Sequence, residues 1–360
     1  MFPYVGLVAM HKCLSMAHAD FKTAKVTKQD EFYTRLDDIA KELKFYKPYF
    51  RDKVVLCNCD DPYESNFFKY FALNFNSLGL KKLIATCYDG SPVQGSELML
   101  DFGDFQSEEP KKIAYKVEIT EVSDYNGDGA INLADVQYLI QNDKNVLSVL
   151  KGNGSFDSPE SIELLKEADI VVTNPPFSLF KEYMSLLIQY EKDFLVIGNT
   201  NALKYKDCFK WFMQDRIRTG YTNFNVGMFF MVPDSFEKYH HIENGRKIAR
   251  VSTSCWFTSL PVEKHKDYLD LYKHYTPEEY PTYDTYDAIN VNKVTDIPCD
   301  YDGIMGVPIT FMDKYNPEQF EIVGEFNNGS DSELDLAKPI VKGKQMYSRV
   351  AIRLKKRSKS

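Results

Sequence analysis

The sequence predicts an α/β fold built on a doubly wound, mainly parallel sheet. Short apolar runs rich in Val, Ile and Leu alternate with segments of helical period up to about residue 200. Turn residues, such as Gly79 and the Asp89-Gly90 pair, close these segments. The length of 360 residues, of which 44% are hydrophobic, suffices for a large core and favours two lobes over one.

The expected elements alternate between helix and strand along the first lobe. An amphipathic helix is expected over residues 28–46, where apolar side chains recur at helical spacing. Strands are expected at 53–57, 82–88, 170–172 and 194–198, and further helices at 65–78, 133–140, 161–168 and 179–190. Such a sheet binds its ligands at the carboxyl ends of the strands, here the segments 58–62, 88–89, 173–177 and 199–201.

The amino-acid composition changes beyond Gly220, and this change determines the expected domain boundaries. Segments 225–232 and 250–260 are aromatic and β-rich, and we expect them to form a hairpin that completes the sheet. Past Pro261 the sequence is rich in Tyr, Pro and Asp, which favours a second, smaller lobe. We expect an N-terminal arm at 1–20, a main domain at 21–261 with an insertion near 91–155, and a C-terminal lobe at 262–360.

Charge gives two opposing signals about a nucleic-acid partner. The net charge of -8 argues weakly against one, because phosphate binding usually leaves an excess of Lys and Arg. After Asp335 the chain holds no acidic residue, and its basic residues there are Lys338, Lys342, Lys344, Arg349, Arg353, Lys355, Lys356, Arg357 and Lys359. This basic tail either follows a phosphate backbone or is a solvated, partly disordered end.

Apolar patterning and cysteine spacing indicate the compartment. No apolar stretch approaches the roughly 18 residues that span a bilayer, and the N-terminal apolar patch lacks a cationic flank. The seven cysteines are scattered, and the spacing of Cys57 and Cys59 suits neither a zinc knuckle nor a redox pair. We expect no membrane partner, a cytoplasmic location and reduced thiols.

The segment VVTNPPFSLF at 171–180 carries the strongest chemical signal, because Asn174, Pro175, Pro176 and Phe177 directly follow an apolar strand. A base amino nitrogen is a poor nucleophile, since its lone pair is delocalised into the ring. The Asn174 side-chain oxygen and the Pro175 carbonyl can accept its two N–H groups and re-localise that pair. The ring of Pro175 locks its φ and Pro176 pushes Pro175 into the extended region, which fixes the direction of the carbonyl. Phe177 offers a stacking face for a base taken out of its helix.

This pattern is typical of a site that transfers a methyl group from S-adenosylmethionine to an exocyclic amine. The simpler interpretation is an X-Pro-Pro turn that closes a strand. The coincidence of Asn174, both prolines, Phe177 and the preceding strand favours the catalytic interpretation. No cysteine nucleophile follows from the pattern, and a strong general base is not required, because proton loss can follow methyl transfer.

A second motif lies at 124–135 and is similar to a calcium loop of the EF-hand or dockerin type. The candidate ligands are Asp124, Asn126, Asp128, the carbonyl of Ala130, and Asp135. Asp135 is shorter than the usual bidentate glutamate, and the preceding segment has a strand pattern rather than a helical one. The loop therefore predicts either a structural calcium ion or a pair of turns before the helix at 133–140.

The chain resembles the EcoRI-type adenine-specific DNA methyltransferase family almost from end to end. The matching blocks are DEFYT at 30–34, CNCDDPYESNFFKYFALNF at 57–75, ADIVVTNPPFSLF at 168–180, WFTSL at 256–260, and the long block at 286–324. The resemblance implies a class I S-adenosylmethionine-dependent, Rossmann-like methyltransferase domain at 21–261. It also implies a target-recognition, DNA-binding lobe at 262–360.

The resemblance assigns the cofactor to several segments. Phe32, Tyr33 and Thr34 would pack against it, unless this aromatic stripe only covers the sheet. Most methyltransferases carry Asp-Pro-Phe-x-Gly-x-Gly where this chain has Asp61 to Phe67, with Ser65 and Phe67 in place of the glycines. Because glycine permits close backbone approach, this loop must hold the methionine moiety differently.

The candidates in and just before this loop are Asn58, Asp60, Asp61, Pro62, Ser65 and Asn66. Asn174 is a further candidate for contact with the cofactor. A carboxylate of Asp60 or Asp61 either pairs with the ammonium group or caps the following helix. Asp89 is the candidate for the ribose hydroxyls, with Tyr88 and Thr86 as alternatives. Ser155 and Phe156 resemble the family's adenine-contacting loop, although a similar segment at 103–107 leaves that assignment open.

The implied activity is site-specific transfer of a methyl group to N6 of a flipped-out adenine in duplex DNA. The implied partners are S-adenosylmethionine and double-stranded DNA, while a cognate restriction endonuclease, the DNA site and the oligomeric state stay open. One alternative is N-methylation of an RNA base or a protein glutamine, since the same turn grips any planar amine. Another is a calcium-responsive DNA-binding module whose active site has decayed.

Overall fold

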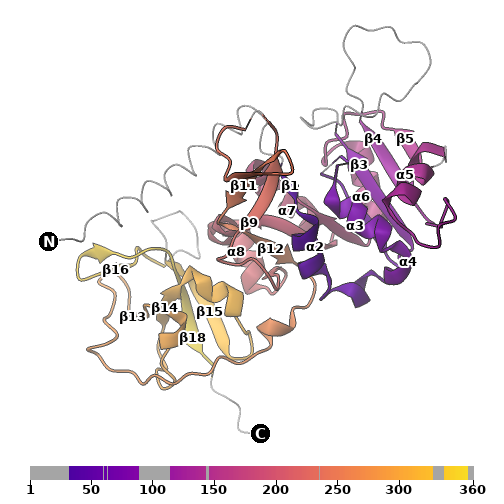
Figure 1. The fold of residues 1–360 in the computed structure, drawn as a ribbon. Helices are drawn as coiled ribbons and strands as arrows, with labels where there is room; N and C mark the ends of the chain where they lie inside the picture. Colours follow the sequence, from indigo (N-terminus) through magenta and orange to yellow (C-terminus); the bar gives the residue numbers. More distant parts are fainter. Residues whose placement is uncertain are drawn as a thin grey trace. The chain divides into compact units, whose positions relative to one another are not determined.

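A computed structural model describes residues 32–59, 61–62, 64–88, 114–142, 146–234, 236–326 and 336–355. The expected N-terminal arm, Asp60, Asp89 and the segment 103–107 lie outside these ranges. The chain divides into two compact units (Figure 1). Unit 1 comprises Met1–Thr200 and Val226–Thr258, and unit 2 comprises Asn201–Asn225 and Ser259–Ser360.

Unit 1 is organised around a large mixed sheet, which confirms the α/β class. Its strands lie in the order β5 (Leu147–Val149), β4 (Tyr115–Ile119), β3 (Lys82–Cys87), β2 (Val54–Cys57), β6 (Ile170–Thr173), β7 (Asp193–Asn199) and β12 (Ser254–Thr258). The central strands β3, β2, β6 and β7 are parallel. Antiparallel pairs follow on both sides, β3 with β4, β4 with β5, and β7 with β12. β2 and β6 are buried at every position, as expected of parallel strands covered on both faces.

Four of the five helices expected in unit 1 lie within two residues of their expected bounds. The helices described in unit 1 are α2 (Leu36–Leu43), α3 (Asn66–Leu73), α4 (Phe75–Leu78), α5 (Leu133–Asn142), α6 (Pro159–Glu167) and α7 (Phe180–Gln189), with short 3-10 turns η1 (Lys47–Phe50) and η2 (Phe177–Leu179). Ser65 caps α3 by accepting the Phe68 N–H. Gly79 ends α4 in the left-handed region, at φ 64°. The helix expected at 65–78 is therefore present, with a break at Asn74.

The helix expected over 28–46 is wrong at its start. Tyr33–Thr34 forms strand β1, which pairs antiparallel with β9 (Met228–Val232). α2 begins only at Leu36, after Arg35 in extended conformation. The helical spacing does mark a helix, but Tyr33 and Thr34 before it pair with a strand far along the chain. This tertiary pairing overrides the local helical preference.

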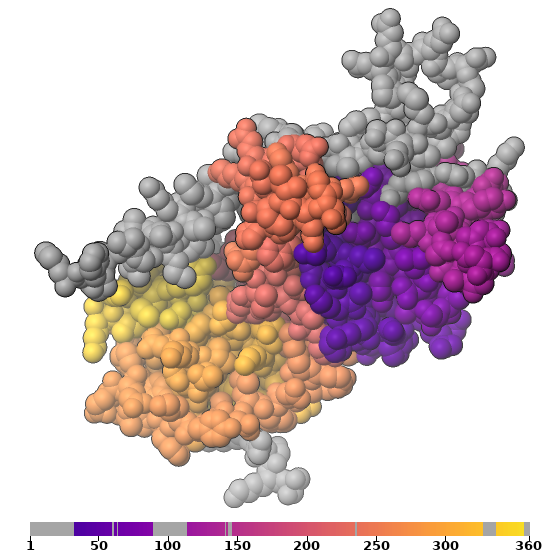
Figure 2. Space-filling view, in the orientation of Figure 1, coloured from indigo at the N-terminus to yellow at the C-terminus, as the bar shows by residue number. Residues whose placement is uncertain are grey.

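The hairpin expected from 225–232 and 250–260 is also wrong. β9 pairs with β11 (Arg246–Val251), and β10 (His241–Glu243) completes a separate sheet in the order β1-β9-β11-β10. Only β12 joins the main sheet, beside β7. In the space-filling view the orange residues of this second sheet adjoin the indigo start of the described chain (Figure 2), where Arg35 and Glu243 form an ion pair at 3.5 Å.

Unit 2 holds a smaller sheet in the order β13 (Ile289–Asn290), β14 (Met305–Pro308), β18 (Arg349–Leu354) and β15 (Phe320–Phe326). Its other elements include α8 (Lys206–Met213), β8 (Arg218–Thr219), β16 (Ile340–Val341), β17 (Lys344–Gln345) and the 3-10 turns η4 (Glu263–His265), η5 (Val294–Asp296) and η6 (Ile309–Lys314). A further 3-10 turn, η3 (Thr200–Lys204), begins at the last residue of the first segment of unit 1 and continues into the sequence of unit 2. In the core of unit 2 the rings of Tyr283 and Phe326 stack, with their centroids 4.7 Å apart.

Part of the basic tail is a strand rather than a disordered end, since Arg349 and Arg353 lie in β18. Arg349, in β18, is 7% exposed, and its side chain donates to Asn290 Oδ1 at 3.3 Å and to the Tyr347 carbonyl at 3.0 Å. Burial lowers the pKa of Arg349 below its usual value. Arg353 pairs with Glu321 at 3.2 Å. These arginines therefore serve the fold, and Lys356, Arg357 and Lys359 lie outside the described residues.

Across the described ranges, no helix is both long enough and apolar enough to cross a bilayer.

Candidate active site

The catalytic turn predicted from the sequence directly follows β6. Asn174 is 6% exposed, and its Nδ2 donates to the Phe32 carbonyl at 2.6 Å. Its Oδ1 is buried and accepts no hydrogen bond from a described residue. A buried acceptor without a partner lowers the stability of the fold by about 1–3 kcal/mol. This cost indicates that a bound ligand donates a hydrogen bond to the atom. The side chain thus presents one fixed, unused acceptor.

The residues after Asn174 are held by prolines and aromatic rings. Pro176 is extended, with φ -54° and ψ 126°, and its carbonyl accepts the Leu179 N–H at 3.0 Å. The ring of Phe177 lies edge-to-face against Phe32, with centroids 6.2 Å apart, and against Phe230 at 6.1 Å. Phe177 is therefore fixed by two aromatic neighbours.

Phe32 has a role that its sequence pattern does not reveal. Its backbone carbonyl, rather than its ring, orients Asn174. The ring packs against Phe230 at 5.9 Å and Phe236 at 5.4 Å, and the side chain is only 4% exposed. The start of the described chain is thereby tied to the turn after β6.

Asn58 follows β2 and is 5% exposed. Its Oδ1 accepts a short hydrogen bond of 2.5 Å from the hydroxyl of Tyr183, which lies on α7. Burial raises the pKa of Tyr183 well above its usual value, so the phenol stays protonated and remains a donor. The sequence does not predict this role of Tyr183, because its spacing only marks it as a buried position on the apolar face of a helix.

Asp61 does not cap the following helix with its side chain. The carboxylate is 3% exposed, and Oδ1 accepts the hydroxyl of Tyr115 on β4 at 2.8 Å. Its Oδ2 lies 3.7 Å from Cys87 Sγ, at the end of β3. Ser65 supplies the cap instead. Asp61 therefore lies among the carboxyl ends of the parallel strands, where a ligand is expected.

Gly154 brings the loop 152–156 onto the end of β3. Its φ is +73°, and a Cβ at this position would lie 2.6 Å from the Cys87 carbonyl oxygen and 3.1 Å from Tyr88 Cα. Only glycine permits this approach. Phe156, two residues on, packs edge-to-face against Tyr183 with centroids 5.1 Å apart. The loop thus reaches the same region as Asn58 and Asp61.

Three other candidate residues have side chains already engaged with the protein or buried. Asn66 Nδ2 donates to the Thr34 carbonyl at 2.8 Å, and Ser155 Oγ donates to Asp157 at 2.5 Å. Thr34 is 1% exposed, and its Oγ1 has no hydrogen-bond partner among the described residues. The side chains of Asn66 and Ser155 therefore already hydrogen-bond within the protein, whereas the buried Thr34 hydroxyl does not.

The loop at 124–135 is closed by its own backbone. Asp124 accepts the N–H groups of Gly127, Asp128 and Gly129. Asp135 accepts those of Tyr125, Asn126 and Asn132, and the bond from Asn132 is the main cause that lowers the pKa of Asp135.

These bonds explain the loop's shape without an ion. Within the described ranges, the carboxylates of Asp124, Asp128 and Asp135 do not form a group of three close enough to share one. The structure gives no support for the calcium prediction.

Known proteins resemble this chain over most of its length. The sequence model of the family described as "Adenine-specific methyltransferase EcoRI" matches residues 20–358. The chain is 46% identical to the Type II methyltransferase M.EcoRI of Escherichia coli, over 93% of this chain and 96% of that protein. It is 37% identical to the Type II methyltransferase M.MpnI of Mycoplasma pneumoniae, over 92% and 97% of the two chains. No solved structure matches the chain.

The family match and the 46% identity both extend over nearly the whole chain. The blocks that carry the resemblance also include the turn that holds Asn174. The chain belongs to the EcoRI-type family of adenine-specific methyltransferases.

Proposed function

We propose that this chain transfers the methyl group of S-adenosylmethionine to the N6 amine of a flipped-out adenine in a defined sequence of duplex DNA. The buried, unpaired Oδ1 of Asn174 carries the proposal. An adenine N–H that donates to this atom satisfies it and returns lone-pair density to the nitrogen. Phe177, fixed by two aromatic neighbours, supplies the stacking face for the base.

We further propose that unit 1 is a class I, Rossmann-like methyltransferase domain. From β2 the chain passes to β3 on one side and later to β6 and β7 on the other. Ligands of open α/β sheets bind at such a reversal of strand order. Asn58 and Asp61 follow β2 and Asn174 follows β6, so the candidate residues flank this point.

The cofactor supplies an electrophilic methyl group when bound. We propose that the carboxylate of Asp61 pairs with its ammonium group, and that the loop 152–156 faces its adenine. The close approach of Gly154 to β3 and the buried position of Asp61 support this placement. Phe32, Tyr33, Thr34, Asn58, Pro62, Tyr88 and Phe156 complete the proposed pocket. Ser65, Asn66 and Ser155 hold its frame.

The transfer itself needs little from the protein beyond placement. Asn174 and Pro175 orient the amine so that it attacks the methyl group in line, with no covalent enzyme intermediate. A rigid turn is well suited to this, because correct orientation supplies much of the rate of a bimolecular reaction.

Incubation of the purified protein with labelled S-adenosylmethionine tests the proposed substrate. We expect N6-methyladenine in duplex DNA at one recurring sequence, which sequencing of the modified DNA would identify. Structured RNA and glutamine-containing protein, added as competitors, should stay unlabelled. Preferential labelling of either competitor would contradict the proposal.

We also propose a restriction–modification setting with a cognate restriction endonuclease, in line with the Type II names of the relatives. DNA from the source cells that lacks the methylation pattern made by the protein would contradict this setting.

Replacement of Asp61 with asparagine should weaken cofactor binding about 10- to 100-fold, because a hydrogen bond to a charged group is worth about 1.5–3 kcal/mol. Calorimetric titration with S-adenosylmethionine measures the change. Tyr115→Phe is the matched control, since it removes the 2.8 Å bond to Asp61 but keeps the carboxylate. Equal affinity of Asp61→Asn and the wild-type protein would remove Asp61 from this role.

A further inference from the structure

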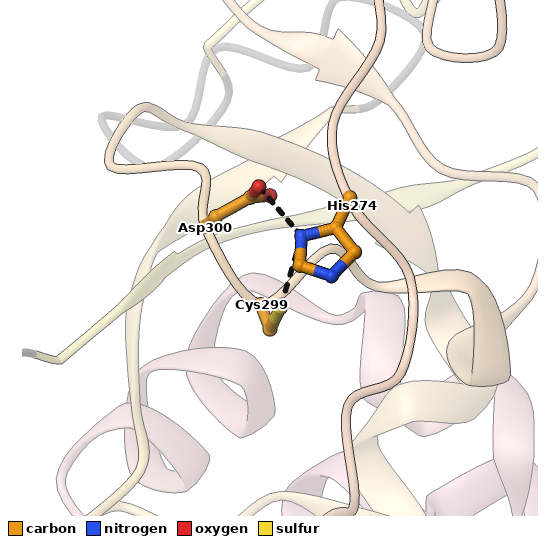
Figure 3. A group of neighbouring side chains, drawn as sticks. All are labelled: His274, Cys299 and Asp300. Carbon is orange, nitrogen blue, oxygen red and sulfur yellow. Dashed lines mark hydrogen bonds and ion pairs between the residues drawn. The ribbon is translucent and has the colours of Figure 1, made fainter.

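Three side chains with different donor atoms converge in unit 2, outside the proposed active site (Figure 3). His274 Nδ1 lies 2.9 Å from Asp300 Oδ2 and 3.8 Å from Cys299 Sγ. The three ligand atoms all lie within 4.8 Å of one another. The His274 side chain is 74% exposed and that of Asp300 is 47% exposed, so a solvated ion can reach them.

Backbone contacts hold these side chains in place. Lys273 and Pro298 form a parallel β-bridge, and the Cys299 N–H donates to the Lys273 carbonyl at 2.9 Å. The Tyr275 N–H donates to Asp300 Oδ1 at 2.8 Å, which leaves Oδ2 directed at His274. The segments 273–275 and 298–300 are thus held next to each other by hydrogen bonds that leave His274 Nδ1, Cys299 Sγ and Asp300 Oδ2 out.

The surroundings favour a cation. Cys299 also lines a cavity of about 670 Å³. The charged residues that line this cavity are Asp270, Asp302, Glu318 and Lys355. Three carboxylates against one ammonium give this region a negative potential, which raises the local concentration of divalent cations.

We propose that His274, Cys299 and Asp300 form a zinc site with one nitrogen, one sulfur and one oxygen ligand and an open fourth position. Thiolate and imidazole together favour zinc over calcium or magnesium, which take oxygen ligands. Ligand atoms around a tetrahedral zinc ion lie roughly 3.3–3.6 Å apart. The separations of 2.9 Å and 3.8 Å bracket this range, so small side-chain rotations complete the site.

Binding replaces protons by metal. His274 binds as the neutral imidazole, with zinc on Nδ1 and the ring proton on Nε2, so it releases a proton to solvent only where it starts as imidazolium. The Cys299 thiol binds as thiolate and releases its proton to solvent. The ion then cross-links the segments 273–275 and 298–301. Zinc should therefore raise the melting temperature of the protein, because it binds the folded state preferentially.

The test uses full-length protein treated with chelator and titrated with zinc against a chromophoric chelator. One equivalent should bind, and His274→Gln and Cys299→Ser should each weaken binding more than about 100-fold. Cobalt should give a thiolate charge-transfer band that is absent in Cys299→Ser. Zinc should raise the melting temperature of the wild-type protein but not of that variant, whose circular dichroism should match the wild type.

The control is the double variant His240→Gln/His241→Gln. These two imidazoles lie with their Nδ1 atoms 2.9 Å apart and offer the protein another place for a divalent cation. The double variant should keep both the affinity and the cobalt band. No zinc binding by the wild-type protein would overturn the proposal. Loss of binding in the double variant with retention in Cys299→Ser would overturn it as well.

Discussion

Replacement of Asn174 with alanine is expected to slow methyl transfer by about 10²- to 10³-fold, the usual effect of removing one fixed hydrogen-bonding group at a reacting centre. The loss should lie in the chemical step, because Oδ1 acts on the amine and not on the cofactor. Single-turnover rates with saturating DNA and S-adenosylmethionine measure it. Affinity for the cofactor should change little.

The alanine variant also leaves the Phe32 carbonyl without its donor, which costs about 1–3 kcal/mol of stability. Asn76→Ala is a matched control for that loss, because Asn76 Nδ2 likewise donates to a backbone carbonyl, that of Val122, at 2.8 Å. It should show nearly full activity and a smaller drop in melting temperature, because Asn76 is exposed. An Asn174→Ala protein with full activity would remove Asn174 from catalysis.

Replacement of Gly154 with alanine should lower affinity for S-adenosylmethionine by more than about tenfold and destabilise the protein. The left-handed backbone at φ +73° costs a non-glycine residue about 1–2 kcal/mol. The new Cβ would also lie 2.6 Å from the Cys87 carbonyl and 2.9 Å from Ala114 Cβ, both fixed by the sheet. The loop 152–156 must therefore move off β3, and Phe156 with it. Calorimetry and thermal unfolding measure the two effects.

Gly152→Ala is the control within the same loop. Its Cβ would meet only the flexible Glu160 carboxylate, at 3.5 Å, and its φ lies outside the left-handed region. We expect cofactor affinity close to wild type. Similar loss in both glycine variants would show that the loop as a whole, and not its approach to β3, determines affinity.

The sequence predicts the central sheet well, because its signals are local. The strands found at β2, β3, β6 and β7 are short apolar runs closed by turn residues, and their existence follows from side chains close along the chain. The turn at 174–177 is predicted for the same reason, since its Asn, Pro and aromatic residues are contiguous. Such patterns fix element type but not pairing.

The parts that could not be predicted depend on distant partners. Tyr33 belongs to a strand only because β9 lies beside it, almost two hundred residues along the chain. Tyr183 and Tyr115 have no local pattern that distinguishes them from other buried tyrosines, yet each donates to a candidate cofactor residue. The role of the Phe32 carbonyl is independent of side-chain type, so no sequence motif can mark it.

The basic end and the calcium-like loop show the limit of composition as a guide. Arg349 contributes to a positive count in the sequence, but in the fold it is buried beside Asn290. Asp124 and Asp135 match a ligand pattern, but both accept backbone N–H groups. In each case the same charged atom suits two partners, and only the tertiary structure decides between them.

The hydrogen bond from Asn174 Nδ2 to the Phe32 carbonyl prevents the amide from turning over. Only an oxygen faces the position where the base is expected. Adenine offers N–H groups at its 6-position, whereas hypoxanthine, which arises when adenine loses that amine by hydrolysis, offers a carbonyl oxygen. Asn174 Oδ1 would then face the carbonyl oxygen of hypoxanthine, and both would be buried acceptors without a donor. Each such acceptor weakens binding of the base by about 1–3 kcal/mol. An anchored amide therefore rejects deaminated sites, which a freely rotating one would tolerate.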